Sequence, residues 1–438
     1  MSKEIQPRIL KGFRDFLPDA ESERIRIQSI LEKTFRRYGF LPIDTPVLEY
    51  TEILLGKGGG ETEKQIYRFT DNGGRDVAMR FDLTVPFARF MAQHRNELYL
   101  PFKRYHMAKV FRGENTQRGR YREFTQCDFD IVGTDSASAD FEILLVMAES
   151  FRSLGIADVR FHLSHRGIFN QFLSSLGASH ASTEVLRCVD KLSKVGREQT
   201  ESDLAELTSA ESAKKILKYI TAEPSNQQTL AKMRKLAGNG DEVPGAGRLE
   251  QVLSYAAELG IEEAFLLDPS ITRGLDYYTG IVFETFLTAL PDIGSVCSGG
   301  RYNDLASLYT KEKLPGVGSS IGLDRLLAAL DELSDGNEKS ATVDVLVLNL
   351  EEELVGHYHA ISETARRHGL SCEVFPELRK LSSQFNFAEK KGIPLGIICG
   401  GEEKKAGTVN LKDLRSRTNY DNLTIEEALQ QAAALLRR

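Results

Sequence analysis

The stretch RGLDYYTG, residues 273–280, brings one arginine, one carboxylate and two phenols together within eight residues. A guanidinium donates hydrogen bonds in a planar fork and stays charged, whereas a tyrosine hydroxyl both donates and accepts. The apolar-rich segment GIVFETF follows directly and predicts a strand. The pattern therefore indicates a site for a small polar molecule at the start of a strand, and it raises the question of what that molecule is.

Two further arginines lie in comparable surroundings. In FRGE, Arg112 is on a predicted strand that runs into a basic loop. On the next predicted strand Phe124 and Gln126 are two residues apart and Asp130 is four further along, so all three lie on one face. In GVGSSIGLDRLL, Arg325 lies in the first turn of a helix entered through glycines, where the backbone can approach a nucleotide closely.

The charge pattern allows two interpretations of the basic region. The chain has a net charge of −7, yet residues 101–122 contain seven Lys/Arg against one acid, Glu114. Such a concentration can meet phosphates even in an acidic protein, or it can be a solvated face. GKGGG (56–60) is not followed by the lysine and hydroxyl of a P-loop, and His162 and His165 lack a nearby third ligand, so we interpret both as ordinary polar sequence.

Length and composition predict a cytoplasmic protein of two or three domains. With 438 residues the chain exceeds one ordinary core. No apolar stretch approaches eighteen residues, and the N-terminus MSKEIQPRILKG lacks the apolar region of a signal peptide, so we expect no membrane association. The five cysteines are scattered without CxxC spacing, which argues against disulfides and favours a reducing compartment.

The first two thirds of the chain predict an antiparallel sheet rather than a Rossmann-type parallel one. Helical spacing from residue 20 ends at Gly39, and prolines frame an extended segment at 42–46. YRFTD and VAMRFDLTVPFARF are predicted strands around the turn DNGGRD. KRYHMAKVFRGE and RYREFTQCDFDIVG predict two more strands joined by a polar loop.

The rest of the chain predicts an insertion, a linker and a second domain. Residues of about 170–260 are helical in pattern and free of chemical motifs, and strands resume at 273. Residues 334–342 are polar and predict a linker between a domain of 1–333 and one of 343–438. The latter alternates strands and helices, which predicts an α/β domain with a mainly parallel sheet, and Thr424 and Glu427 are spaced as a capping box before its last helix.

Together these motifs resemble those of a known family. FRGE…RGRYREF is similar to motif 2 of class II aminoacyl-tRNA synthetases, GVGSSIGLDRLL to motif 3, and YGFLPIDTPVLE, with Pro46, to the dimer-forming motif 1. RGLDYYTG, DLTVPFARF and SGGRYNDL resemble the histidine-specific signatures of the histidyl-tRNA synthetase family. The resemblance covers nearly the whole chain. Ser320 and Asp324 depart from it, standing where motif 3 commonly has Gly and Glu.

The resemblance implies an α+β class II catalytic domain carrying the helical insertion, a C-terminal anticodon-binding domain, and a cytoplasmic homodimer. It implies a ligase that forms histidyl-adenylate from L-histidine and ATP, with Mg²⁺ whose protein ligands are unknown, and then charges tRNA-His. The implied catalytic residues are Arg273 and Arg112. The implied ATP-binding residues are Arg112 at the α-phosphate, Arg325 at the γ-phosphate, Phe124 stacked on adenine and Glu114 at its edge.

The implied histidine site answers the question that RGLDYYTG raises. A neutral imidazole presents one donor and one acceptor, so its recognition needs an acceptor and a donor at a set separation. Asp130 would accept and Tyr278 would donate. The whole implied histidine-binding set is Asp82, Leu83, Thr84, Arg112, Gln126, Asp130, Arg273, Tyr277 and Tyr278.

Two alternatives to the ligase have sequence-level tests. A non-catalytic paralogue that regulates histidine biosynthesis would resemble the catalytic domain alone and need not keep the arginines. A tRNA-sensing module would be attached to a larger protein. The presence of Arg112, Arg273 and Arg325 with a C-terminal α/β domain favours the enzyme.

Overall fold

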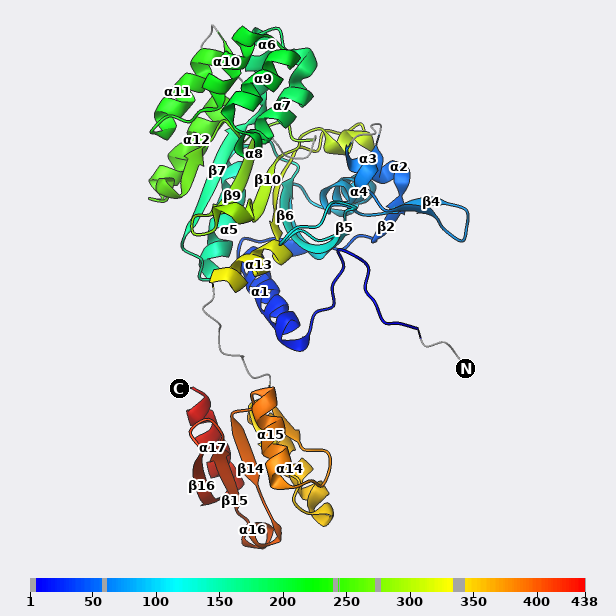
Figure 1. Ribbon diagram of the computed structural model, residues 1–438, viewed down its shortest axis with the longest axis vertical. Helices are drawn as coiled ribbons and strands as arrows, with labels where there is room; N and C mark the ends of the chain where they lie inside the picture. Colours follow the sequence, from blue (N-terminus) through cyan, green and yellow to red (C-terminus); the bar gives the residue numbers. More distant parts are fainter. Residues whose placement is uncertain are drawn as a thin grey trace. The chain divides into compact units, whose positions relative to one another are not determined.

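The computed structural model describes residues 5–56, 61–238, 243, 245–271, 277–333 and 343–437 (Figure 1). The chain forms two compact units, Met1–Asp335 and Gly336–Arg438. The predicted linker at 334–342 lies outside the described residues. Each unit is described by itself.

The first unit is built on an eight-stranded sheet. Its strand order is β1 (Leu41–Pro42), β5 (Phe102–Phe111), β6 (Glu123–Val132), β11 (Gly316–Gly322), β10 (Cys297–Arg301), β9 (Ile281–Leu287), β7 (Val159–His165) and β8 (Phe265–Leu267). The two edge strands β1 and β8 are parallel to their neighbours, and every other pairing is antiparallel. The predicted antiparallel sheet is confirmed.

Alternation along β6 divides this sheet into two chemically different faces. Cys127, Phe129 and Ile131 are buried in the main hydrophobic core. Helix α1 (Pro18–Arg37) and helix α5 (Ala137–Ser153) contact the sheet there, and α1 has buried residues at helical spacing. The intervening β6 residues Phe124, Gln126 and Asp130 occupy the opposite face, which is the face that carries the polar site.

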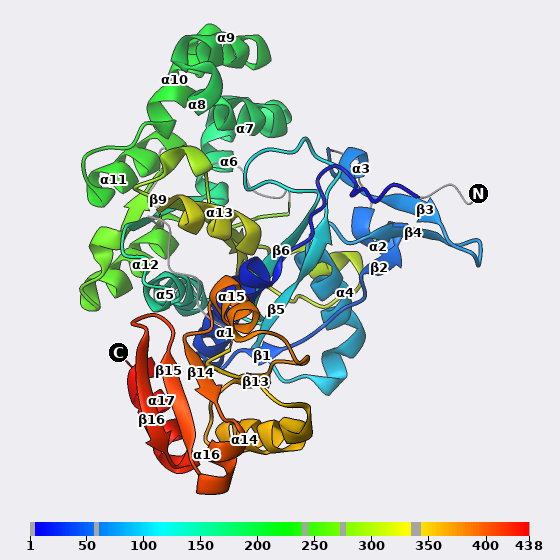
Figure 2. The ribbon, with the colours of Figure 1, turned by 60° about the horizontal axis from the view of Figure 1, so that its bottom comes forward.

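One predicted strand is a helix. Around the turn at 71–75, β3 (Arg68–Thr70) and β4 (Asp76–Met79) pair as predicted, and β2 (Leu48–Tyr50) joins them in a three-stranded sheet. However, DLTVPFARF forms α4 (Thr84–His94), which lies beside β5 (Figure 2). The carboxylate of Asp82 accepts a hydrogen bond from the backbone N–H of Val85, and Pro86 lies in the first turn, where its missing N–H costs nothing. The predicted strand over this segment is therefore wrong.

Most of the remaining helices of the first unit lie between Arg166 and Glu258, the part of the chain with the predicted helical pattern. Its helices are α6 (Arg166–Ser175), α7 (Ser182–Asp190), α8 (Leu192–Val195), α9 (Arg197–Leu207), α10 (Ala210–Ile220), α11 (Asn226–Ala237) and α12 (Ala246–Glu258), drawn in green in Figure 1. Short helices α2 (Thr51–Leu55) and α3 (Glu61–Gln65) follow β2, and α13 (Leu323–Leu333) follows β11. Short 3₁₀ turns lie at Arg95–Glu97, Ser179–Ala181, Glu262–Ala264, Pro291–Ile293 and Leu305–Leu308.

The second unit has a five-stranded sheet in the order β13 (Cys372–Val374), β12 (Val345–Val347), β14 (Leu395–Ile398), β15 (Val409–Asp413) and β16 (Thr418–Leu423). Its helices are α14 (Val355–Arg367), preceded by the turn Glu352–Leu354, α15 (Leu381–Lys391), α16 (Gly401–Ala406) and α17 (Ile425–Leu436). The predicted capping box of Thr424 and Glu427 is present.

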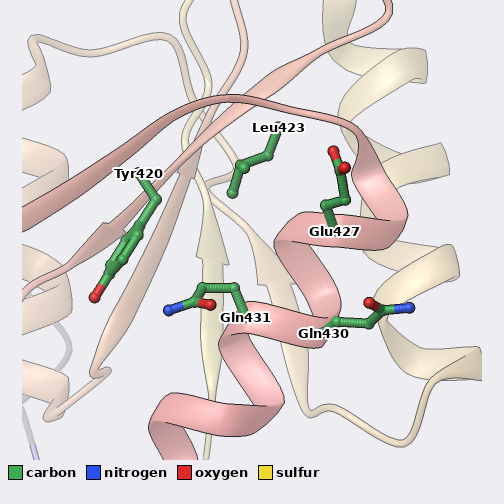
Figure 3. Close-up of a pocket in the computed structure, with 5 residues that line it drawn as sticks. All are labelled: Tyr420, Leu423, Glu427, Gln430 and Gln431. Atoms are coloured by element: carbon green, nitrogen blue, oxygen red, sulfur yellow. The ribbon is translucent and has the colours of Figure 1, made fainter.

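The prediction of a mainly parallel sheet in this unit is wrong. Strand β12 is parallel to both β13 and β14, but β14–β15 and β15–β16 are antiparallel. The short connection from β15 to β16 requires that these two strands pair antiparallel, because a parallel pair needs a long crossover. Between β16 and α17 lies a pocket that contains none of the predicted site residues (Figure 3); it is lined by Tyr420, Leu423, Glu427, Gln430 and Gln431.

Candidate active site

Strand register gathers the polar face of the first unit's sheet into one site. Asp130 on β6 is directly opposite Arg104 on β5 and Gly318 on β11. A Cβ atom at Gly318 would lie 1.9 Å from Asp130 Oδ1, so only glycine leaves room for this carboxylate. Likewise a Cβ atom at Gly300 would lie 2.9 Å from the ring of Tyr278. The glycines of β10 and β11 thus make space for the side chains of the site.

Asp130 is held by two residues that the sequence did not suggest. Its Oδ2 lies 2.7 Å from Arg104 Nη2, and its Oδ1 accepts a short hydrogen bond from the hydroxyl of Tyr302. Arg104 is completely buried and its guanidinium lies over the ring of Phe87 at 4.3 Å. Burial raises the pKa of Asp130, and the guanidinium of Arg104 opposes that shift. In the sequence Arg104 is one of seven Lys/Arg residues in the basic region 101–122, and nothing local singled it out.

The residues of RGLDYYTG that the structure describes lie against the start of α4. The hydroxyl of Tyr277 is 3.2 Å from Asp82 Oδ2, and the rings of Tyr277 and Tyr278 have centroids 5.0 Å apart. Asp82 is fully buried, and burial raises its pKa to about 6. Leu83 and Thr84 complete this corner of the site, with the Leu83 carbonyl oxygen 3.4 Å from Arg104 Nη2. Arg273 itself lies outside the described residues.

The predicted nucleotide residues form a second group. Arg112 donates through Nε to the Phe81 carbonyl at 2.9 Å, and its guanidinium lies 5.1 Å from the centroid of the Phe124 ring. Glu114 Oε1 is 3.8 Å from Arg112 Nη1, and its Oε2 is 3.9 Å from Arg120 Nη1. Arg112 and Phe124 therefore offer a charged fork beside an aromatic face, with a carboxylate next to them.

Arg325 lies at the start of α13, close to the same loop. Its Nη1 donates to the Ser295 carbonyl at 2.5 Å, and a Cβ atom on Gly119 would lie 3.3 Å from its Cγ. Burial, with a contribution from Arg120, lowers the pKa of Arg325 to about 10, so the guanidinium remains charged at neutral pH. The loop between β5 and β6 thus lies against the helix that carries Arg325.

Asp324, one of the two departures from motif 3, anchors this helix. It accepts hydrogen bonds from Arg24 Nη1 at 3.0 Å and from the backbone N–H of Thr125 at 2.7 Å, and it also pairs with Arg14. The carboxylate is buried, and both of its oxygens accept from these donors. Asp324 therefore fastens α13 to α1 and β6 rather than facing the site.

The part of the chain that the structure describes contains no group of three or more His, Cys, Asp or Glu residues arranged to hold a metal ion. His162 pairs with Asp268 at 2.8 Å, and His165 accepts from the backbone N–H of Gly167 at 3.1 Å. Within the same described ranges no helix is long and apolar enough to cross a membrane.

Both units match families of known proteins. The family model for histidyl-tRNA synthetase matches residues 12–326, and the model for the anticodon binding domain matches residues 344–435. A crystal structure of histidyl-tRNA synthetase from Nostoc sp. PCC 7120 superimposes with a TM-score of 0.87 at 32% identity, covering 99% of this chain and 100% of that one. A catalytic sheet of this kind joined to an anticodon-binding domain defines an aminoacyl-tRNA synthetase.

Relatives in sequence indicate which amino acid the family uses. A histidine–tRNA ligase from Treponema denticola is 52% identical over 99% of both chains, and one from Rhodopirellula baltica is 47% identical over 95% of both. The chain belongs to the histidyl-tRNA synthetase family. The resemblance read from its motifs is confirmed.

Proposed function

We propose that this chain is a histidine–tRNA ligase in which one pocket of the first unit carries out both chemical steps. In the first step a carboxylate oxygen of L-histidine attacks the α-phosphorus of ATP, and pyrophosphate leaves. In the second step a terminal ribose hydroxyl of tRNA-His attacks the carbonyl carbon of the adenylate, and AMP leaves. The full-length match to histidine–tRNA ligases carries this conclusion and does not favour the regulatory alternative.

Adenylate formation needs positioning and charge neutralisation more than proton transfer. The attacking carboxylate is already ionised at neutral pH, so no general base is required. Arg112 would bind the α-phosphate and the histidine carboxylate, because its planar fork donates paired hydrogen bonds. Arg325 would bind the γ-phosphate, while Phe124 stacks on adenine and Glu114 accepts from its amino group. The grouping of Arg112, Phe124 and Glu114 within about one side-chain length supports this set.

Arg273 would act from the opposite side of the α-phosphate during the transition state. Mg²⁺ commonly binds through substrate phosphates with only one or two protein carboxylates, so ATP would bring the ion with its outer phosphates. The ion would neutralise charge on the leaving pyrophosphate.

The histidine side chain would lie between Asp130 and Tyr278. Asp130 would accept from the imidazole N–H, and the Tyr278 hydroxyl would donate to the other ring nitrogen. Arg104 supports this role because it counters the burial of Asp130 and favours its charged, accepting form. The α-ammonium group would meet Asp82, Thr84 and the side-chain oxygen of Gln126, with the Leu83 backbone and Tyr277 closing the pocket.

Pyrophosphate exchange tests the amino-acid assignment. ATP–pyrophosphate exchange measured with each of the twenty amino acids should proceed rapidly with histidine alone. A site with buried polar partners rejects apolar isosteres by about 10⁴-fold, so leucine and phenylalanine should exchange at background rates. Comparable exchange with any other amino acid would refute the histidine pocket.

We also propose a homodimer in the cytoplasm. Apolar side chains along β1 to β3 are exposed on the single chain, namely Leu41, Val47, Leu48, Tyr50 and Phe69, as a buried subunit interface requires. All five cysteines are free, which suits a reducing compartment.

Sedimentation tests the dimer. Leu48→Asp should shift the dimer toward monomer, whereas Leu259→Asp, at an exposed site after α12, should not. A fully active wild-type monomer at nanomolar concentration would refute the dimer.

A further inference from the structure

The side-chain amide of Gln126 is held on its nitrogen side. Nε2 lies 2.7 Å from Ser320 Oγ and 3.4 Å from Asp128 Oδ1. Oε1 is buried and accepts no hydrogen bond from any residue within the described ranges. Gln126 is only 8% exposed, so this oxygen is a desolvated acceptor within the site. A buried acceptor of this kind needs a donor, and an ammonium group is donor only.

The Asp128 carboxylate selects one orientation of the amide. A glutamine amide can turn over at almost no steric cost, because its oxygen and nitrogen are nearly the same size. The hydroxyl of Ser320 has one proton and also hydrogen-bonds Asp128, so toward Gln126 Nε2 its oxygen is an acceptor. A carboxylate only accepts, and therefore it requires the NH₂ group of Gln126 to face it. Ser320 and Asp128 are register partners on β11 and β6, which keeps both on the same side of Gln126.

Asp128 is assigned no contact with histidine or ATP in the proposed reaction. It is 1% exposed on β6, and its Oδ2 is 3.8 Å from Arg104 Nη2. Burial raises its pKa to about 7, with Arg104 opposing the shift and Asp130 and Asp82 reinforcing it. Above that pH Asp128 is the acceptor that the orientation of Gln126 demands.

We propose that Asp128, assisted by Ser320, is a positioning residue that turns the Gln126 carbonyl oxygen toward the α-ammonium group of histidine. The inference rests on the assignment of Gln126 to that group under the proposed function. In the turned-over amide, NH₂ would face the ammonium, and two donors would confront each other. The inference also gives a reason for Ser320, which stands where motif 3 commonly has glycine: its hydroxyl completes the contact with Gln126 Nε2.

The test compares two ligands that differ in the ammonium group alone. Calorimetry at pH 8 should measure the dissociation constants of L-histidine and of 3-(imidazol-4-yl)propionate, which lacks the amine. Asp128→Ala should weaken histidine about tenfold, as expected for loss of an oriented hydrogen bond to a charged group, and leave the propionate unchanged. Ser320→Ala should have a smaller effect in the same direction. Cys127→Ala, a buried change on the opposite face of β6, is the control for general loosening and should not alter the ratio of the two constants.

A double-mutant cycle separates positioning from direct attraction. If Asp128 acts through Gln126, then Asp128→Ala should not change the ratio further in a Gln126→Ala background. An equal change in both backgrounds would mean direct attraction between Asp128 and the ammonium, and would overturn the inference. Asp128→Asn in the same cycle serves if Asp128→Ala does not fold, because an amide no longer enforces one orientation.

The two hypotheses fail in different ways. If Gln126→Ala raises the ratio of the histidine constant to the propionate constant but Asp128→Ala and Asp128→Asn leave it unchanged, Asp128 has no positioning role while the ammonium assignment stands. If Gln126→Ala leaves the ratio unchanged, the assignment of Gln126 is itself wrong, and the inference falls with it.

Discussion

Removing the buried guanidinium of Arg104 should destabilise the protein in a pH-dependent way. Arg104→Met keeps much of the apolar stem but leaves the buried Asp130 carboxylate without the cation 2.7 Å away. Breaking a buried pair by removing one partner costs about 3–5 kcal/mol. Protonation of Asp130 would remove the unpaired buried charge. For an aspartate of ordinary pKa, protonation costs about 1.5 kcal/mol at pH 5 but about 5.6 kcal/mol at pH 8.

The sign of the pH dependence follows from the protonation of Asp130 in the variant. Loss of Arg104 raises the folded-state pKa of Asp130 further, so the variant loses stability as pH rises from the ordinary aspartate range toward the raised value. The destabilisation should therefore be about 1.5 kcal/mol at pH 5 and about 3–5 kcal/mol at pH 8. Urea unfolding of wild type and variant at the two pH values measures it.

Two further variants make this prediction specific to the pair. Arg104→Met combined with Asp130→Asn should show a clearly smaller pH dependence than Arg104→Met alone, because no carboxylate is left at position 130 and only Asp128, 3.8 Å from Arg104 Nη2, still loses the cation. Lys103→Met, on the same strand, breaks a half-exposed pair with Glu142 and should cost at most about 1 kcal/mol at either pH. Equal destabilisation by Arg104→Met at pH 5 and pH 8 would refute the reasoning.

Four further predictions concern the chemistry and the domains. Asp130→Asn should raise the KM for histidine about 10- to 100-fold in pyrophosphate exchange by removing a charge-assisted acceptor; an equal rise in the KM for ATP would place it outside the imidazole pocket. Arg273→Ala should lower the pre-steady-state rate of adenylate formation about 10²–10³-fold with nearly unchanged KM values, so a near-normal rate on folded protein would remove its catalytic role. Burial raises the pKa of Asp82 to about 6, so the histidine affinity of wild type relative to Asp82→Asn should fall as pH drops below 6, and a constant ratio from pH 5 to pH 8 would contradict its ammonium role. Deleting residues 343–438 should spare histidine-dependent pyrophosphate exchange but weaken tRNA charging, and an unchanged KM for tRNA-His would show that this unit does not bind it.

The sequence alone was sufficient to predict features whose interacting residues lie close together in the chain. The period of two along β6 placed Phe124, Gln126 and Asp130 on one face, because successive side chains of a strand alternate. The capping box at Thr424 was equally readable, since both of its partners lie within one turn. The conformation of DLTVPFARF was not readable from the sequence, because a short apolar run fits a strand or a helix. The hydrogen bond from the Val85 N–H to Asp82 favours the helix.

The composition of the candidate site depended on the tertiary structure. Arg104 and Tyr302 reach Asp130 from β5 and from beyond β10, and only strand register brings them together. Ser320 likewise meets Gln126 only through the pairing of β6 with β11, whereas Asp128 reaches Gln126 from two residues away on the same strand. By itself the sequence determined the family, the motif arginines and the alternation that places Asp130 on the polar face of the sheet. Only the fold decided which buried charges and hydroxyls surround that carboxylate, because the partners of a desolvated group are set by register between distant strands.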